Sequence, residues 1–268
     1  MKLPGRHFAR NLVERRNLLS QLVRRDFQQR FVGSAAGWLW GIIHPLVLLM
    51  SWYFVFQICL KTPLPKTEVT TNYALFLFCG FLPWMLFSDT VQRSASSLLD
   101  HANLITKTIF PSEIVPVSIF LSSLVNHLIA LGLALALVGV YAKHVSVWML
   151  TLPVYIVLIG LLAVGLGWIV AGLHVYLRDT SQVLMVVLTF WFWLTPIFID
   201  EGFFPGRFRF LLRANPLAFL VRAYRDRLLS NQHPSMREMA IIAAYAVSFF
   251  VLGGLFFRHL KRGFADVL

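Results

Sequence analysis

The sequence of 268 residues is poor in charge. Only 13% of its residues are charged, whereas 58% are hydrophobic, and the mean hydropathy is +0.71. A soluble domain carries about 25% charged residues, so this composition excludes an ordinary soluble domain. The apolar residues also form long blocks, as they do in transmembrane proteins. We therefore predict an all-α integral membrane protein of one domain.

Cysteine is scarce as well. Cys59 and Cys79 both lie in or beside apolar blocks. A thiol in that setting behaves as a small hydrophobic side chain, so we predict neither a disulfide nor a metal site. The N-terminus lacks an early apolar run and a small-residue cleavage site, which excludes a signal peptide. The first spanning helix is then expected to act as its own insertion signal.

Acidic residues are outnumbered by basic ones. The chain has 24 Lys and Arg but only 12 Asp and Glu, which gives a net charge of +12. In a membrane protein such an excess is typical of orientation signals and contacts with lipid headgroups. The arginines are not part of any nucleic-acid motif. We therefore predict membrane lipids, and no nucleic acid, as charged partners.

Six apolar stretches predict transmembrane helices. Most of them reach the length of about 20 residues that crosses roughly 30 Å of hydrocarbon. The fifth does not, because its 16 residues rise only about 24 Å. The stretches cover about residues 38–60, 73–91, 115–142, 147–177, 183–198 and 239–257.

The distribution of Lys and Arg predicts that both termini are cytoplasmic. In that orientation 14 of them lie inside and three outside, leaving aside seven arginines between the fifth and sixth stretches. The positive-inside rule strongly favours this orientation. It places the arginine-rich segment RANPLAFLVRAYRDRLL, residues 213–229, in the periplasm, against a simple application of the same rule.

Residues 213–229 contain the start of a helix. Asn215 is a good N-cap, and Pro216 suits the first helical position. Because the fifth stretch is short, we favour a periplasmic re-entrant helix pair that dips into the outer leaflet, with arginines reaching the headgroups. The alternative is an amphipathic loop that lies flat on the outer surface. Arg222 and Asp226 are four residues apart and are expected to pair. The predicted apolar stripe is Leu217, Leu220, Val221, Tyr224 and Leu228.

Residues 8–31 predict an amphipathic helix along the cytoplasmic surface. Arg15, Arg16 and Asp26 interrupt its pattern. The helix is either a membrane anchor or a guard at a lateral entrance for a lipid-bearing substrate. The three arginines near its junction with the first span would bind either lipid headgroups or, bidentately, a lipid pyrophosphate. They are Arg24, Arg25 and Arg30.

A second amphipathic segment, residues 97–116, lies between the second and third spans. Pro111 ends its helical pattern. A connector needs only a few residues, so a helix here is economically explained by a partner contact. We predict that its apolar stripe seats in a groove of that partner. The stripe is Leu98, Ala102, Ile105 and Ile109.

Few polar residues fall inside the predicted spans. His44, Asp89, Asn126 and His127 are among them, and such residues are functional candidates by default. For His127 we favour a hydrogen bond between helices.

Small and aromatic residues also mark the spans. In the fourth span Ala163, Gly167 and Ala171 predict a close-packing face. Most of the 39 aromatic residues are expected at the membrane interface or facing lipid, although an aromatic-lined conduit would suit a carbohydrate.

Five stretches, in this order, resemble the membrane subunits of ABC-2 type polysaccharide exporters, the O-antigen and teichoic-acid group. We accordingly divide the chain into an N-terminal cytoplasmic amphipathic helix (1–34), an ABC-2 type transmembrane domain (35–262) and a cytoplasmic tail (263–268). The stretches are GWLWGIIHPL (37–46), NLITKTIFPSEIVPVS (103–118), VYLRDTSQV (175–183), TPIF (195–198) followed by NPLAFLVRAYRDRLL (215–229), and FADVL (264–268).

The resemblance implies a permease subunit that works as a homodimer with two separate ATPase subunits. It would move lipid-linked polysaccharide, most closely O-antigen on an undecaprenyl carrier, across the bacterial inner membrane. Within the group, capsular polysaccharide or teichoic acid are alternative cargoes. The chain has no G-x-x-x-x-G-K-[ST] loop, so ATP and Mg²⁺ would be bound by the partner ATPase. This chain would then be no enzyme and would hold no cofactor or metal.

The resemblance also assigns roles to three sets of residues. The coupling set would contact the ATPase and consists of Asn103, Leu104, Ile105, Lys107, Phe110, Pro111, Arg178 and Asp179. The entrance set would admit the substrate beside the first span and consists of Arg24, Arg25, Arg30, Gly37, Trp40 and Pro45. The outer gate set consists of Asn215, Pro216, Leu217, Leu220, Tyr224 and Arg225.

Two other classes are competing hypotheses. A stand-alone secondary carrier or lipid flippase usually has two matching halves and buried acids in broken helices, and this sequence has no internal repeat. A membrane-embedded transferase needs clustered acids or histidines, whereas Asp89, Asp179, Asp200 and Glu201 are scattered over both predicted faces. Neither class needs an ATPase, so co-purification of this chain with an ATPase would distinguish an ABC exporter from both.

Overall fold

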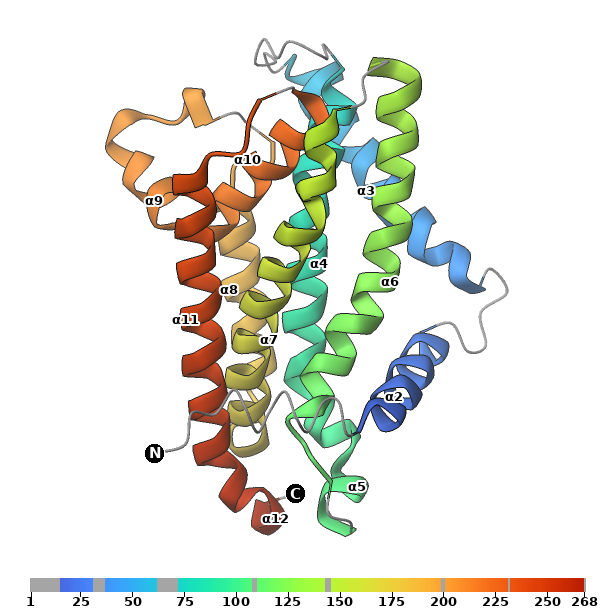
Figure 1. Ribbon diagram of the computed structural model, residues 1–268, viewed down its shortest axis with the longest axis vertical. Coiled ribbons are helices and arrows are strands. Elements are labelled where there is room, and N and C mark those ends of the chain that lie inside the picture. Colours follow the sequence, from blue (N-terminus) through green and yellow to red (C-terminus); the bar gives the residue numbers. More distant parts are fainter. Residues whose placement is uncertain are drawn as a thin grey trace.

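The computed structural model describes residues 15–30, 37–61, 72–107, 110–142, 146–198, 201–230 and 232–267. Throughout these ranges the chain forms helices and connecting turns, with no strand, so the predicted all-α fold is confirmed. Figure 1 shows a bundle of long helices that run roughly side by side, with short helices at both ends.

Within the described ranges, five helices are long and apolar enough to cross a membrane. The predicted shortness of the fifth stretch is confirmed, because its helix has only 15 residues. The long elements are α3 (Trp40–Tyr53) with a π-helical extension (Phe54–Cys59), α4 (Tyr73–Asp100), α6 (Ile114–Leu137) with an extension (Val138–Ala142), α7 (Leu152–Tyr176) after a 3-10 turn (Val147–Thr151), and α11 (Met236–Leu260); the shorter one is α8 (Thr180–Leu194).

The short helices divide between two ends of the bundle (Figure 1). We name the two ends after the predicted orientation, and the end called inner carries α5 (Ala102–Lys107), the turn from α7 to α8, and α12 (Phe264–Val267). The outer end carries α9 (Arg209–Ala214) and α10 (Pro216–Leu229). An oblique helix, α2 (Arg16–Gln29), packs against α6 in the inner half. The segment 213–229 therefore lies at the end opposite the predicted coupling helix.

The core of the bundle is formed by α4 and α7. The apolar window of α4 is 78% buried and that of α7 is 72% buried, whereas that of α3 is only 11% buried. The predicted close-packing face of α7 is confirmed, since Ala163 and Ala171 are fully buried and Gly167 faces α4. A Cβ atom at Gly167 would lie only 2.8 Å from Ser94 Oγ. Small residues thus let the two central helices approach closely.

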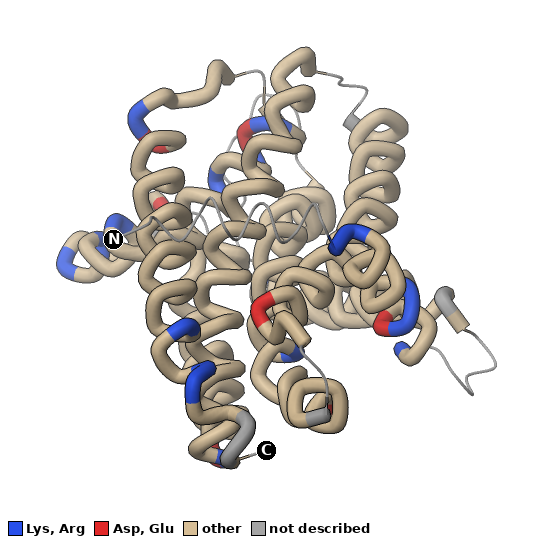
Figure 2. Tube along the Cα trace, turned by 60° about the horizontal axis from the view of Figure 1, so that its bottom comes forward, with Lys and Arg blue, Asp and Glu red and all other residues tan. Residues whose placement is uncertain are grey.

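Charged residues avoid most of the bundle. The helices α3, α6, α7 and α8 contain no Asp, Glu, Lys or Arg. Figure 2 accordingly shows long tan stretches, with blue and red confined to short segments. Because an unpaired charge is costly in hydrocarbon, this pattern fits a membrane bundle.

One predicted boundary is wrong. The second span was expected to end near Val91, but α4 continues to Asp100, so Asp89 lies within a helix and not at its end. The first amphipathic helix begins, in the described residues, at Arg16; residues 8–14 lie outside them. Its amphipathic character is confirmed, since Leu22 is buried while Arg24 and Arg25 are exposed.

Candidate functional site

A network of ion pairs joins α2 to α4 and α6. Arg30, just after α2, donates through Nη2 to Asp89 Oδ2 at 2.9 Å and to Ser123 Oγ at 3.0 Å. Ser123 Oγ donates to Asp89 Oδ2 at 2.5 Å. Arg93 bonds to Asp26 and lies 3.9 Å from Asp89. Two arginines and two aspartates thus balance one another, and Asp26, which interrupts the amphipathic pattern, serves as an ion-pair partner.

A cavity of about 360 Å³ opens beside this network, between α3, α4 and α6. Its wall combines hydrogen-bonding side chains with aromatic and aliphatic ones, a lining that suits a polar ligand attached to an apolar chain. We call it the inner cavity. Its polar lining is Arg30, His44, Ser88, Asp89, Gln92, Ser123 and Asn126, and its apolar lining includes Trp40, Pro45, Leu48, Phe81 and Met85.

The inner cavity brings together half of the predicted entrance set. Arg30, Trp40 and Pro45 line it. Pro45 has no N–H, so the Gly41 carbonyl on the same wall lacks its helical donor. Arg24 and Arg25 are exposed on α2 and do not line the cavity.

Gly37 of the entrance set lies just before α3. It adopts a φ of +51°, which favours glycine, at the start of the short 3-10 turn Gly37–Leu39. The residue therefore shapes the turn into the first span without lining the cavity.

The predicted coupling helix is observed as α5 at the inner end. Asn103 and Thr106 are exposed on it. One member of the expected contact face is wrong, however, because Leu98 is fully buried. Ile105 and Phe110 are half-buried and pack against the same core cluster of this chain. The described part of the stripe is therefore covered at least in part by the protein's own bundle. Ile109 and the side chain of Lys107 lie outside the described residues.

The inner end is closed by the C-terminal segment. Phe264 of α12 is buried in the cluster that Ile105 and Phe110 contact. Lys261 bonds to Glu113, and Tyr176 Oη donates to the Leu260 carbonyl at 2.9 Å.

The remaining members of the coupling set lie at the same end. Pro111 is buried beside α5, while Arg178 and Asp179 are exposed in the turn from α7 to α8. Asn103, Thr106, Arg178 and Asp179 therefore leave a polar surface at the inner end. Leu104 is half-buried.

The predicted start of the outer helix is confirmed. Asn215 caps α10, accepting from Leu217 N at 3.0 Å, and Pro216 occupies its first turn. The same Asn215 side chain accepts from Trp191 Nε1 at 2.8 Å and donates to Thr195 Oγ1 at 3.1 Å. The cap thus also fastens α10 to the end of α8.

The predicted lipid contact of α10 is wrong. Of its 14 residues, 12 are buried within this chain. The stripe that includes Leu217, Leu220 and Leu228 packs into the core formed with α4 and α7. Tyr224 is also fully buried, and its hydroxyl lies 3.1 Å from His127 Nε2, which confirms the predicted interhelical hydrogen bond of His127.

Arg225 is not a snorkelling residue. It is 9% exposed, and its guanidinium donates to the carbonyls of Phe76 (3.2 Å), Pro196 (2.6 Å) and Ile197. It also lies 3.6 Å from the centroid of the Phe76 ring. The arginine therefore links α10 to α4 and to the turn after α8, where the Pro196 and Ile197 carbonyls lie beyond the last helical residue.

Arg222 and Asp226 are not paired as predicted. Arg222 instead donates bidentately to Glu201, through Nε and Nη2, and makes a single bond through Nη1 to Glu238 in the first turn of α11. Burial raises the pKa of the Asp226 carboxyl to about 6, and the neighbouring Arg227 opposes this rise.

Sequence reasoning missed several of these residues. Ser123 and Gln92 line the inner cavity, and Glu238 pairs with Arg222. Their only sequence signal is polarity within or beside an apolar stretch. The partners are far apart in the chain, so no local spacing identifies them.

Comparisons with known proteins agree with this architecture. The profile described as ABC-2 type transporter matches residues 17–229. The O-antigen export system permease protein RfbA of Myxococcus xanthus is 27% identical over 260 residues, covering 96% of this chain and 98% of the relative. A protein of the same name from Klebsiella pneumoniae is 27% identical over 253 residues, covering 94% and 95%. The polysialic acid transport protein KpsM of Escherichia coli is 21% identical over 240 residues, covering 88% and 91%.

Proposed function

The chain belongs to the ABC-2 type transporter family, and we propose that it is the permease subunit of an ATP-driven exporter of lipid-linked polysaccharide. The relatives named as O-antigen export permeases cover nearly the whole chain and are more similar to it than the polysialic acid transport protein. This difference supports O-antigen on an undecaprenyl carrier as the cargo. Capsular polysaccharide or teichoic acid is the second candidate cargo.

We propose six membrane spans, with both termini in the cytoplasm of a bacterial inner membrane. The span that completes the six is α8, the fifth along the chain, whose 15 residues rise only about 22 Å. The buried residues that follow it, Thr195 to Phe198, support the shortened crossing from within the protein. In this orientation the outer end is periplasmic, and α9 and α10 form a re-entrant gate over the bundle.

A second copy of the chain is proposed to cover α3 and α8. These helices contact each other through Trp52 and Phe192, whose ring centroids are 5.5 Å apart. Their outward faces carry exposed apolar side chains such as Met50, Phe54 and Phe190. Pairing two such faces would place a conduit between two permease subunits.

Two ATPase subunits are proposed to contact the inner end. The exposed polar side chains of α5 and of the turn from α7 to α8 supply the contact surface. Because Ile105 and Phe110 link α5 to the bundle core, a push on α5 would move the buried helices. In the inner cavity, the network around Arg30 and Asp89 would receive the lipid-linked head group.

The single observation that carries the proposal is the family match over 17–229. The test is export of lipid-linked polysaccharide in proteoliposomes containing this chain with the ATPase encoded beside its gene. We expect export only with both proteins and ATP. Export by this chain alone would instead establish a stand-alone carrier.

A variant tests the coupling surface. Asn103→Lys with Thr106→Lys should abolish ATP-dependent export while leaving the permease folded, because both side chains are exposed. Ser96→Lys, on an exposed position of α4 one turn before its end, is the matched control and should export normally. Full export by the α5 variant would exclude this surface as the coupling contact.

A further inference from the structure

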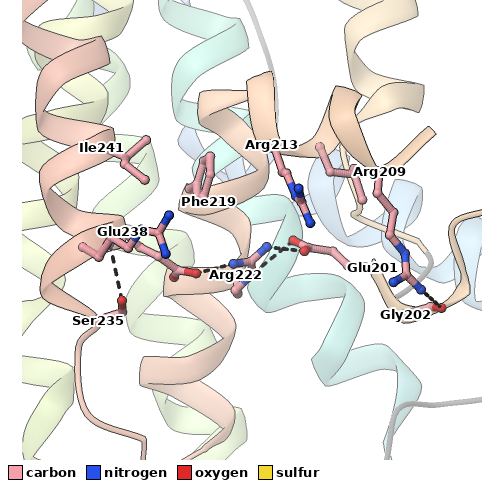
Figure 3. A pocket seen from close by; sticks show the side chains of 11 residues that line it. Glu201, Gly202, Arg209, Arg213, Phe219, Arg222, Ser235, Glu238 and Ile241 are labelled. Carbon is pink, nitrogen blue, oxygen red and sulfur yellow. Dashed lines mark hydrogen bonds and ion pairs between the residues drawn. The ribbon is translucent and has the colours of Figure 1, made fainter. Parts of the chain in front are cut away.

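A larger cavity lies at the outer end, between the 3-10 turn Glu201–Phe203, α9, α10 and the first turns of α11 (Figure 3). Its volume is about 750 Å³, roughly twice that of the inner cavity. We call it the outer cavity. Four arginines and two glutamates line it: Arg209, Arg213, Arg222, Arg237, Glu201 and Glu238.

Among the residues that the structure describes, Arg222 alone of the four arginines has a carboxylate partner. Figure 3 shows Arg222 between Glu201 and Glu238, and it bonds to both. Arg209 reaches only the backbone carbonyls of Phe204 and Gly202, each at 3.4 Å. Within the described residues, Arg213 has no hydrogen-bond or ion-pair partner, and neither does Arg237.

The outer cavity therefore has unused hydrogen-bonding capacity and an excess of two positive charges. A guanidinium fork matches the oxygens of a phosphoryl group, and it binds them through paired charge-assisted hydrogen bonds. A single carboxylate would occupy only one fork. Two free arginines and a surplus of two charges fit a diphosphate ester, which carries two negative charges as a diester and two to three as a monoester.

The remaining wall of the outer cavity is apolar. Leu212, Phe219 and Ile241 contribute to it, from α9, α10 and α11 respectively. Arg237 is the second residue of α11, and α11 is a spanning candidate. The cavity thus lies where a spanning helix begins, which is the level of lipid headgroups.

We propose that the outer cavity binds the phosphate or diphosphate head of an anionic lipid, with Arg213 and Arg237 as its main ligands. The apolar wall receives the first carbons of the lipid chain. The assignment to the periplasmic side rests on the proposed function, whereas the binding itself does not. Two sources share this chemistry: a phospholipid of the bilayer, and the diphosphate carrier of an exported glycan.

The test measures equilibrium binding of radiolabelled farnesyl diphosphate to the full-length protein in phosphatidylcholine nanodiscs. We expect the double variant Arg213→Gln/Arg237→Gln to lose affinity about 100-fold, since each lost charge-assisted bond is worth about tenfold. Arg207→Gln is the matched control, because Arg207 is an exposed outer arginine that stacks on Phe208 and does not line the cavity. It should change affinity less than about twofold.

Competition identifies the source of the ligand. Displacement by dihexanoylphosphatidylglycerol as effective as that by unlabelled farnesyl diphosphate assigns the cavity to bilayer phospholipid. Displacement by the diphosphate alone assigns it to the carrier. Unchanged affinity of the double variant, or equal displacement by farnesol, would overturn the proposal.

A second, charge-preserving double variant distinguishes loss of binding from loss of folding. Arg213→Lys/Arg237→Lys keeps both charges but loses both forks, so we expect affinity to fall about tenfold. Wild-type affinity in this variant would also overturn bidentate recognition. The assay needs neither ATPase nor glycan, so its failure and the failure of ATP-dependent export are separate results.

Discussion

The two ends of the molecule use arginine differently. In the inner half, Arg30 and Arg93 are matched by Asp26 and Asp89, and this network joins α2 to the bundle. At the outer end, buried Arg225 bonds to backbone carbonyls and Arg222 holds two glutamates, while Arg213 and Arg237 have no partner in the described part of the chain. Arginines that bond to carboxylates or carbonyls stabilise contacts between helices, whereas arginines without such partners are available to bind a ligand.

The largest expected effect comes from removing the buried outer arginine. Arg225→Leu removes the guanidinium that donates to the Pro196 and Ile197 carbonyls in a buried site, and it removes the side-chain donor to the Phe76 carbonyl in α4. We expect a loss of about 3–5 kcal/mol in stability. The measurement is the temperature at which half of the purified protein aggregates after heating. Arg207→Leu, at an exposed position, should have little effect.

Gly80→Ala provides an independent test of the same packing. A Cβ atom there would lie 2.5 Å from Arg225 Nη2. The guanidinium would have to move away from the carbonyls it donates to, so the temperature at which half of the protein aggregates should fall as well. A stable Gly80→Ala protein would contradict a structural role for Arg225.

The next effect concerns the outer ion pairs. Arg222→Gln removes the cation that bonds to both Glu201 and Glu238, and we expect a loss of about 1–2 kcal/mol in stability. Adding Glu201→Gln should recover part of this loss, because it removes the repulsion. If Arg222→Gln/Glu201→Gln were no more stable than Arg222→Gln, the ion pairs of Arg222 with Glu201 and Glu238 would contribute no net electrostatic stabilisation.

These outer contacts also mark the limit of sequence reasoning. The Asn215–Pro216 helix start could be predicted because the cap bonds to an N–H only two residues away. The partners of Arg225 could not be, since Phe76 is 149 residues distant. Arg222 shows the same limit, because two distant glutamates replace the expected neighbour Asp226.

The helices themselves were predictable because their apolar length is a local property. The direction of an apolar face was not. Both Leu98 and Leu217 were expected to face outward, toward a partner or lipid, yet both are fully buried in this chain. Helical spacing identifies a face but not the surface that covers it, because that surface comes from distant helices.

A smaller effect is expected in the inner network. We predict a coupling of about 1 kcal/mol between Arg30→Gln and Asp89→Asn in a double-mutant cycle on thermal stability. The Arg30–Asp89 ion pair, with N and O 2.9 Å apart, is only partly exposed, and Ser123 hydrogen-bonds to both side chains. Arg30 and Asp26 are 3.8 Å apart, so the cycle with Asp26→Asn should give a smaller coupling. The reverse order would mean that Arg30 mainly stabilises α2.

The smallest expected effect concerns Asp226, a carboxyl at the outer end. Unlike those of Asp26 and Asp89 at the inner end, its charge is not fully compensated by a neighbouring cation. Burial raises the pKa of Asp226 to about 6 in the folded protein, from an ordinary value of 3.8. The folded state therefore binds this proton more tightly than the unfolded state, and stability falls as pH rises from about 4 to 6. Asp226→Asn removes this dependence. At pH 8 the variant should be more stable than wild type by about 1 kcal/mol, allowing for partial exposure, and the difference should vanish near pH 3.5. If the aggregation temperatures of wild type and Asp226→Asn changed in parallel with pH, ionisation of Asp226 would not destabilise the folded protein.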